Sequence, residues 1–131
     1  MLVDKGMFDQ AALIVVDVQR GFCPGGNLAV AHADEIIPNI HRVAEAFNTI
    51  VLTQDWHPAD HISFAENHEG KKPYDTIQLN YGEQVLWPSH CVQGTADAEL
   101  HPNLNLPQAQ LVIRKGFHQA IDSYSAFMEA D

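Results

Sequence analysis

Two short apolar runs with a helical pattern between them place the strongest limit on how this chain folds. Residues 11–18 and residues 49–53 are dominated by apolar and β-branched side chains, which is typical of strands buried on both faces. Residues 34–47 repeat apolar side chains at helical spacing, and Pro38 falls near the first turn, where a missing N–H is tolerated. The order strand, helix, strand predicts a βαβ unit and therefore a largely parallel sheet.

A third strand is predicted for residues 110–114, on the far side of a long polar stretch. Residues 56–109 are rich in Pro, His, Asn and Gly and show no pattern for a long helix. Connections of that length are usually functional or disordered. Residues 117–131 give no clear pattern. A length of 131 residues suits one domain and is too short for two of ordinary size, so we expect residues 1–131 to form a single α/β domain.

The charge balance excludes several classes of partner. The chain has 7 Lys and Arg against 17 Asp and Glu, which gives a net charge of −10. Binding to phosphate backbones and to anionic membrane surfaces depends on Lys and Arg, so we expect no nucleic-acid partner and no membrane partner. A small neutral substrate is compatible with this balance.

The cysteines and the first residues indicate the compartment. Cys23 and Cys91 are too few for a disulfide framework, and we interpret both thiols as reduced in the cytoplasm. The N-terminal part contains no long apolar run, since Asp17 directly follows Val15 and Val16. We therefore expect neither a signal peptide nor a membrane span.

A charged residue stands at the predicted carboxyl end of each strand. Asp17 closes the first strand, Asp55 follows the second and Lys115 follows the third. In parallel sheets, ligands bind beyond the carboxyl ends of the strands. We therefore expect these three side chains to converge on one crevice.

The segment Asp55-Trp56-His57 is the strongest local signal for a metal. Residues i and i+2 of an extended segment point to the same face, so the Asp55 carboxylate and the His57 imidazole can address one ion. His61 and His90 are further candidate ligands. A mixed oxygen and nitrogen ligand set suits zinc, iron or manganese without choosing among them. The alternative is that Asp55 caps a turn and His57 is a surface residue.

Each of the other candidate residues has a structural and a functional interpretation. Asp17 either binds loop amides or is functional, because a carboxylate among buried residues is rare otherwise. Lys115 either extends into water from a strand end or forms a charge pair with Asp17 that activates a nucleophile. Cys23 and Cys91 are small core residues unless one of them is that nucleophile.

Aromatic residues lie in loop-like segments near the predicted crevice. Phe22, Trp87 and Tyr124 either fill the core or sandwich a planar ring. The residues alone leave both interpretations open.

Taken in order along the chain, these motifs resemble the nicotinamidase (pyrazinamidase) family of the isochorismatase-like cysteine hydrolases. The resemblance covers essentially the whole chain, and several ordered motifs are more specific than any one of them. The matching segments are residues 16–19 (Val-Asp-Val-Gln) with Phe22 and 24–26 (Pro-Gly-Gly), 53–58 (Thr-Gln-Asp-Trp-His-Pro), 61–64 (His-Ile-Ser-Phe), 87–95 (Trp-Pro-Ser-His-Cys-Val-Gln-Gly-Thr), 114–116 (Arg-Lys-Gly) and 123–127 (Ser-Tyr-Ser-Ala-Phe).

The resemblance implies a fold, a reaction and a role for each site residue. The fold is a Rossmann-like, three-layer α/β fold with a mostly parallel sheet, of which this chain covers the N-terminal part. The reaction is hydrolysis of nicotinamide, and of pyrazinamide, to the acid and ammonia in NAD salvage, with one divalent metal ion (zinc, iron or manganese). The implied roles are Asp17 and Lys115 in catalysis, Phe22, Trp87 and Tyr124 in ring binding, and Asp55, His57 and His90 as metal ligands, with His61 as a further ligand in some relatives.

The chain departs from the family at the nucleophile. The family's cysteine lies further downstream, after another strand, and neither Cys23 nor Cys91 matches it. We therefore expect a domain incomplete at its C-terminal side, with a second polypeptide or a homo-oligomer among its candidate partners. The alternatives are an inactive fragment that binds metal or nicotinamide, and another amidase or isochorismatase-type hydrolase of the same fold.

Overall fold

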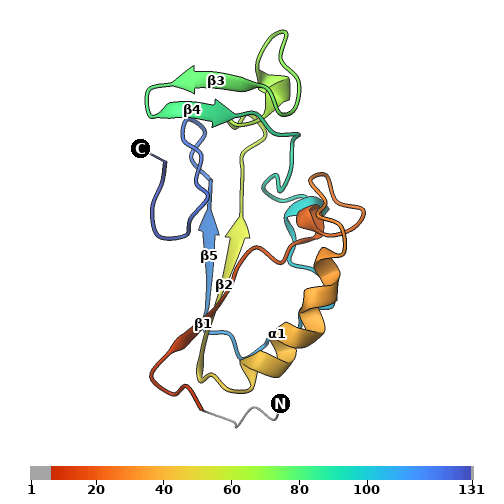
Figure 1. The fold of residues 1–131 in the computed structure, drawn as a ribbon, viewed down its shortest axis with the longest axis vertical. Helices are drawn as coiled ribbons and strands as arrows, with labels where there is room; N and C mark the ends of the chain where they lie inside the picture. The colour runs from red at the N-terminus through yellow and green to blue at the C-terminus, as the bar shows by residue number, and fades with distance from the viewer. Residues whose placement is uncertain (1–6, 131) are drawn as a thin grey trace.

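The centre of the molecule is a three-stranded parallel sheet. The computed structural model describes residues 7–130, and its sheet contains β1 (Ala12–Val15), β2 (Thr49–Asp55) and β5 (Leu111–Lys115) in the order β1-β2-β5. Both pairings are parallel, with Val15 opposite Leu52 and Asp55 opposite Lys115. The predicted α/β class and parallel sheet are confirmed (Figure 1).

The connection between β1 and β2 is helical, but its α-helix is shorter than predicted. Ala33–Ile36 form a 3-10 turn, η2, and α1 spans only Ile37–Ala44. Pro38 is in the first turn of α1, where it has no N–H to donate. The four residues after α1 turn back toward the sheet, and the chain enters β2 at Thr49.

The hydrophobic core lies between α1 and one face of the sheet. Its buried members come from β1, β2, α1 and the loops, namely Val15, Val18, Ile37, Ala44, Ile50, Leu52 and Leu106. The opposite face carries Ile14, Val16 and Leu111, which are 39%, 59% and 51% exposed. The expectation that residues 11–18 are buried on both faces is therefore wrong, because within residues 7–130 the apolar packing covers one face only.

The long polar stretch contains a β-hairpin that its sequence pattern did not predict. β3 (Thr76–Leu79) and β4 (Gly82–Val85) pair antiparallel, and Leu79 stands opposite Gly82. The two short strands mix apolar and polar residues, and Gln84 is their one buried residue. The hairpin lies beyond the carboxyl ends of β2 and β5, and the chain after β5 runs toward it (Figure 1). The rest of the stretch holds the 3-10 turns η3 (Ala65–Asn67) and η4 (Ala96–Ala98), and no long helix, as predicted.

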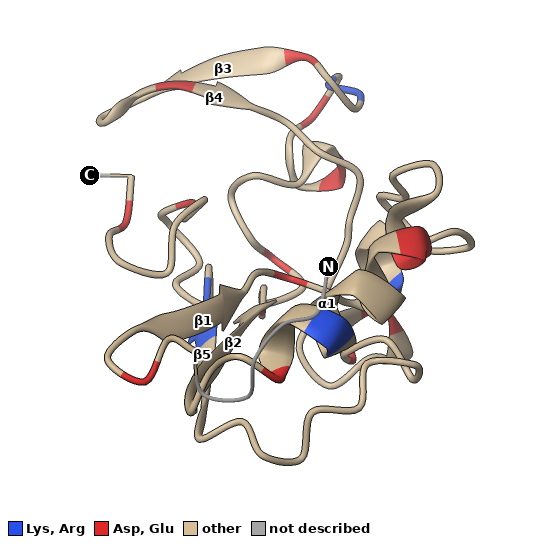
Figure 2. Ribbon diagram, turned by 60° about the horizontal axis from the view of Figure 1, so that its bottom comes forward, with Lys and Arg blue, Asp and Glu red and all other residues tan. Residues whose placement is uncertain are grey.

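Charge is spread along the chain rather than confined to one element. Acidic positions occur on the hairpin, in the loops and near the sheet, whereas Lys and Arg positions are few (Figure 2). Within the part of the chain described by the structure, no helix has the length and apolar character needed to cross a membrane.

The two faces of the sheet differ enough to be tested with matched isoleucines. Ile50 is fully buried in the core, whereas Ile14 is 39% exposed on the open face. We expect Ile50→Ala to lower the free energy of unfolding by about 2–5 kcal/mol, because it leaves a cavity. Ile14→Ala should cost less than about 1 kcal/mol. Urea unfolding followed by circular dichroism measures both, and equal losses would contradict this description of the core.

Candidate metal centre and reactive cavity

A cavity of about 150 Å³ opens at the carboxyl ends of the strands. The predicted catalytic residues, metal ligands and ring-binding residues all line this cavity, whereas His61 does not. Its walls are formed by Asp17, Phe22, Asp55, His57, Trp87, His90, Lys115, Asp122, Ser123 and Tyr124. The predicted convergence of the strand ends is thus what the structure shows, and two further residues, Asp122 and Ser123, join it.

The strands place the three charged residues directly. Asp55 and Lys115 are the last residues of β2 and β5 and stand opposite each other in the register. Asp17 lies two residues beyond β1 in the left-handed region, with φ 52°. Its backbone N–H donates to Thr53 O at 3.2 Å, and Thr53 Oγ1 donates to Asp17 Oδ1 at 2.6 Å. The bend at Asp17 therefore holds its carboxylate beside the ends of β2 and β5.

One ammonium group joins the two carboxylates. Lys115 Nζ lies 2.8 Å from Asp17 Oδ2 and also pairs with Asp55 Oδ1. Burial alone would lower the pKa of Lys115, but the charges of Asp55 and Asp17 raise it above its ordinary value. Lys115 is therefore charged at neutral pH and forms ion pairs with both carboxylates.

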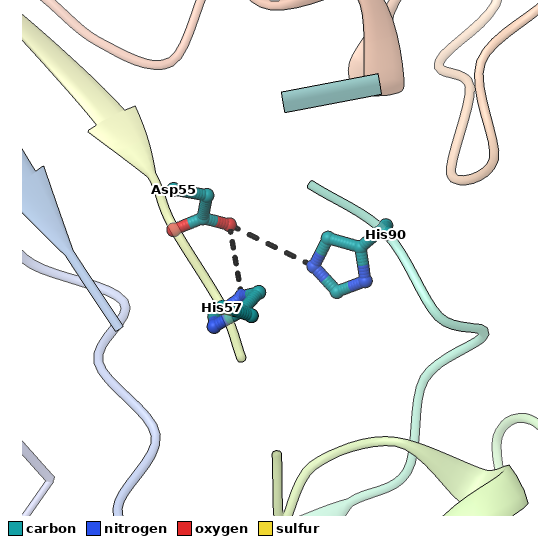
Figure 3. Close-up of side chains that lie close together, drawn as sticks. All are labelled: Asp55, His57 and His90. Atoms are coloured by element: carbon teal, nitrogen blue, oxygen red, sulfur yellow. Dashed lines mark ion pairs between the residues drawn. The ribbon is translucent and has the colours of Figure 1, made fainter. Parts of the chain in front are cut away.

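The second oxygen of Asp55 faces two histidines. Asp55 Oδ2 lies 3.4 Å from His57 Nε2 and 3.7 Å from His90 Nε2, and all three side chains are buried (Figure 3). His57 Nδ1 donates to Gly116 O at 2.7 Å, and His90 Nδ1 donates to Pro88 O at 2.8 Å. A carbonyl oxygen only accepts, so Nδ1 carries the hydrogen in both rings and Nε2 of each neutral ring has a free lone pair.

These three atoms fit a divalent metal ion. A carboxylate oxygen and two imidazole lone pairs converge on one point, which is unfavourable unless a cation or protons occupy it. Burial alone would raise the pKa of Asp55, but hydrogen bonds with His57 and His90 and the charge of Lys115 hold it well below its usual range. Burial alone would lower the pKa of His57, but Asp55 raises it. The site therefore favours positive charge at this point.

His61 has a different set of contacts. It is fully buried, its Nε2 donates to Ile121 O at 3.1 Å, and its Nδ1 contacts Ser63 Oγ at 2.7 Å. Ser63 N also donates to His61 Nδ1, at 3.3 Å. His57, His61 and Asp122 lie close enough for a second metal grouping, but both ring nitrogens of His61 are already engaged. In this structure His61 connects the loop after β2 to the segment after β5.

Aromatic side chains form the outer walls of the cavity. The ring of Phe22 lies 5.6 Å from the ring of His90, and Trp87 Nε1 donates to Tyr124 Oη at 3.3 Å. Tyr124 is 64% exposed, so this wall faces solvent. A planar ring entering the cavity would pass between these aromatic faces.

Asp122 was not predicted from the sequence, because it lies in a segment without a clear pattern. It is 3% exposed, and its carboxylate accepts from Gln84 Nε2 at 3.0 Å and from Ser123 N at 2.9 Å. The bond with Gln84 joins the segment after β5 to β4. Asp122 therefore closes the side of the cavity nearest the hairpin.

Neither cysteine lines the cavity. Cys23 and Cys91 are both buried and unpaired. Burial, with the carboxylates of Asp55 and Asp97, raises the pKa of the Cys91 thiol, and burial raises that of Cys23. Both are therefore protonated at neutral pH, whereas the nucleophilic form of cysteine is the thiolate.

The fold and the residue pattern define the class of protein. The profile of the isochorismatase domain matches residues 11–127, so the chain belongs to the isochorismatase family.

Within that family, the similar proteins are nicotinamidases. The nicotinamidase of Acinetobacter baylyi is 75% identical over 123 residues, and that of Escherichia coli is 42% identical over 122 residues. The alignments cover 94% and 90% of this chain but 58% and 57% of those proteins. The chain thus spans somewhat more than half the length of these relatives, and the resemblance seen in its motifs is confirmed.

Solved structures agree with this placement. An Acinetobacter baumanii nicotinamidase and pyrazinamidase superposes with a TM-score of 0.90 at 71% identity, covering 91% of this chain and 57% of the other. The pyrazinamidase of Pyrococcus horikoshii, solved in complex with zinc, superposes with a TM-score of 0.64 at 38% identity, covering 88% and 57%.

The contacts of His61 predict a pH dependence of stability. Burial and the neighbouring His57 lower the pKa of His61 to about 4, below the 6.5 of a free imidazole. Between these values the unfolded chain binds the proton and the folded chain does not. His61 should therefore make the free energy of unfolding fall as the pH falls from about 6.5 to about 4, by up to about 1.4 kcal/mol per pH unit.

The variant His61→Gln isolates this contribution from those of the carboxylates. Urea unfolding across the same pH window should show a shallower slope for the variant than for the unaltered chain. Parallel curves for the two proteins would show that His61 binds a proton equally well in the folded and unfolded states.

Proposed function

We propose that this chain forms the metal-binding and ring-binding part of a nicotinamidase, an enzyme that hydrolyses nicotinamide to nicotinate and ammonia. The observation that carries the proposal is the single cavity that holds Asp17, Lys115, the Asp55, His57 and His90 cluster and the aromatic walls. The names of the relatives support nicotinamide as the substrate, and pyrazinamide is a second planar amide of similar shape.

The metal ligands in this proposal are Asp55, His57 and His90. Their free lone pairs are the ones that converge, whereas the ring nitrogens of His61 are engaged elsewhere. A bound divalent ion would supply positive charge that attracts and orients a ring nitrogen of the substrate. Zinc, iron and manganese all suit this ligand set, and zinc has the additional support of the Pyrococcus horikoshii structure.

The other residues orient the substrate and move a proton. Phe22 and Trp87 hold the pyridine ring, with Tyr124 at the same wall. Asp17 is the more accessible of the two carboxylates, with 16% exposure against 8% for Asp55, and it accepts the proton of the attacking thiol. Lys115 favours the thiolate by its charge. The thiolate attacks the amide carbon, Asp17 returns its proton to the nitrogen so that it leaves as ammonia, and water then hydrolyses the thioester to nicotinate and the free thiol.

The attacking thiol has to come from outside the residues of this chain that line the cavity. Cys23 and Cys91 are buried elsewhere, and both are held in the protonated form. Further sequence of the same protein, or a second polypeptide, supplies the cysteine in this proposal. The denaturing intact mass of the purified native protein separates an assembly that contains this cysteine from an inactive chain that binds metal or nicotinamide only.

The cellular role follows from the reaction. Conversion of nicotinamide to nicotinate is a step of NAD salvage, and we place it in the cytoplasm. The unpaired state of Cys23 and Cys91 supports a reducing compartment.

The metal ligands can be tested without any turnover. We expect the metal-free protein to bind one Zn²⁺. Replacing a residue that only holds a ligand in place weakens metal binding by roughly 10–100-fold, and we expect Asp55→Asn, which alters a ligand itself, to weaken it further. Asp60→Asn is the matched control, because Asp60 is an exposed aspartate in the same loop region. Calorimetric titration measures both affinities, and equal weakening of the two variants would contradict the ligand assignment.

The catalytic assignment can be tested by ammonia release from nicotinamide, using the protein produced from its complete native gene. Lys115→Ala should lower the rate by about 100- to 10,000-fold, because Asp17 and the thiol lose their charge partner. Lys72→Ala should leave it unchanged, since Lys72 is exposed and distant in sequence from every cavity residue. Circular dichroism confirms that both variants fold. An undiminished rate in Lys115→Ala would remove Lys115 from the mechanism.

A further inference from the structure

The side chain of Gln19 is fully buried and bonded to the backbone of a metal ligand. Gln19 Oε1 accepts from Asp55 N at 2.9 Å, and Gln19 Nε2 donates to Asp55 O at 2.9 Å. The second hydrogen of Nε2 is donated to Ala98 O at 2.8 Å. The carboxamide therefore uses both of its hydrogens and its oxygen on backbone groups.

On the side of Asp55 where β1 no longer pairs with β2, the Gln19 carboxamide takes the place of a neighbouring strand. The pairing of β1 with β2 stops at Val15 and Leu52, because the chain bends away at Asp17. On the other side of β2, β5 continues to Lys115, opposite Asp55. Asp55 thus has a strand neighbour on one side only, and the Gln19 carboxamide supplies the N–H and C=O partners that a strand would supply on the other.

The same side chain also relates Asp55 to the segment that carries His90. Ala98 follows Asp97, and the Asp97 carboxylate accepts from Cys91 N at 2.8 Å, directly after His90. Gln19 therefore connects the end of β2 to η4, and η4 is connected to the His90 turn. Two ligands from distant parts of the chain are placed relative to each other through these bonds.

We propose that Gln19 is a positioning residue for the metal site, which sets the backbone of Asp55 so that Oδ2 faces His57 and His90 while Oδ1 faces Lys115. This inference rests on the metal site proposed above. Residues that hold a metal ligand in place typically affect metal affinity by about 10–100-fold when they are replaced.

Gln54 provides a matched control. It is also buried, at 6% exposure, and its Nε2 also donates to Ala98 O at 2.8 Å. Its Oε1 accepts from Arg114 Nε at 3.3 Å instead of from the backbone of Asp55. Replacing Gln54 therefore removes a buried glutamine bond to the same acceptor without removing a bond to the metal ligand.

The experiment compares Gln19→Met with Gln54→Met in the full chain stripped of metal. Titration with Co²⁺, followed by its visible absorption, reports both the affinity and the geometry of the ligands. Gln19→Met should weaken Co²⁺ binding by about 10–100-fold and shift the absorption bands. Gln54→Met should leave the Co²⁺ affinity and the absorption bands close to those of the unaltered chain. Thermal unfolding of the metal-free proteins should show a loss of stability in both variants.

Two outcomes overturn the inference, and they differ in whether the proposed metal site also fails. Unaltered Co²⁺ affinity and spectrum in Gln19→Met would leave the metal site intact and exclude a positioning role for Gln19. Failure of the unaltered chain to bind Co²⁺ would remove the proposed metal site and this role together. If Gln19→Met does not fold, Gln19→Glu serves instead, since it keeps the size and the acceptor for Asp55 N and loses the paired donors.

Discussion

The ammonium group of Lys115, placed between Asp17 and Asp55, is the interaction on which the rest of the site depends. Parallel strands bring the carboxylates of Asp17 and Asp55 to adjacent ends of one sheet, where burial and mutual repulsion are unfavourable. The shared ammonium group offsets this repulsion and contributes to the lowered pKa of Asp55. Because Lys115 engages one oxygen of Asp55, the other oxygen is left to face His57 and His90.

Around this charged centre, hydrogen bonds from buried polar side chains hold the loops in place, whereas apolar packing holds the helix against the sheet. The apolar core covers one face of the sheet, away from the cavity walls. The loops that form those walls are joined by buried side chains bonded to distant backbone groups, as Gln19 is to Asp55 and His61 to Ile121. Such bonds are directional, so they specify where a loop lies as well as holding it there.

The sequence predicted those features that depend on local patterns. Apolar runs and helical spacing predicted the parallel sheet, and the strand ends predicted that Asp17, Asp55 and Lys115 would meet. Local patterns did not reveal the hairpin, whose short strands mix apolar and polar residues, nor Asp122 and Gln19, whose partners are remote in sequence. They also overstated the burial of residues 11–18, because exposure of a sheet face depends on what packs against it.

By itself, the sequence determined the order of the three sheet strands and the helix between the first two, and it marked Asp55, His57, His61 and His90 as candidate metal ligands, because periodicity and residue chemistry are local properties. Only the tertiary structure decided which histidines are free to do so. His57 is oriented by Gly116 and His90 by Pro88, which leaves Nε2 of each ring facing Asp55. His61 has both ring nitrogens engaged by Ser63 and Ile121. The availability of a lone pair depends on hydrogen-bond partners, and for His57 and His61 one of those partners lies far along the chain.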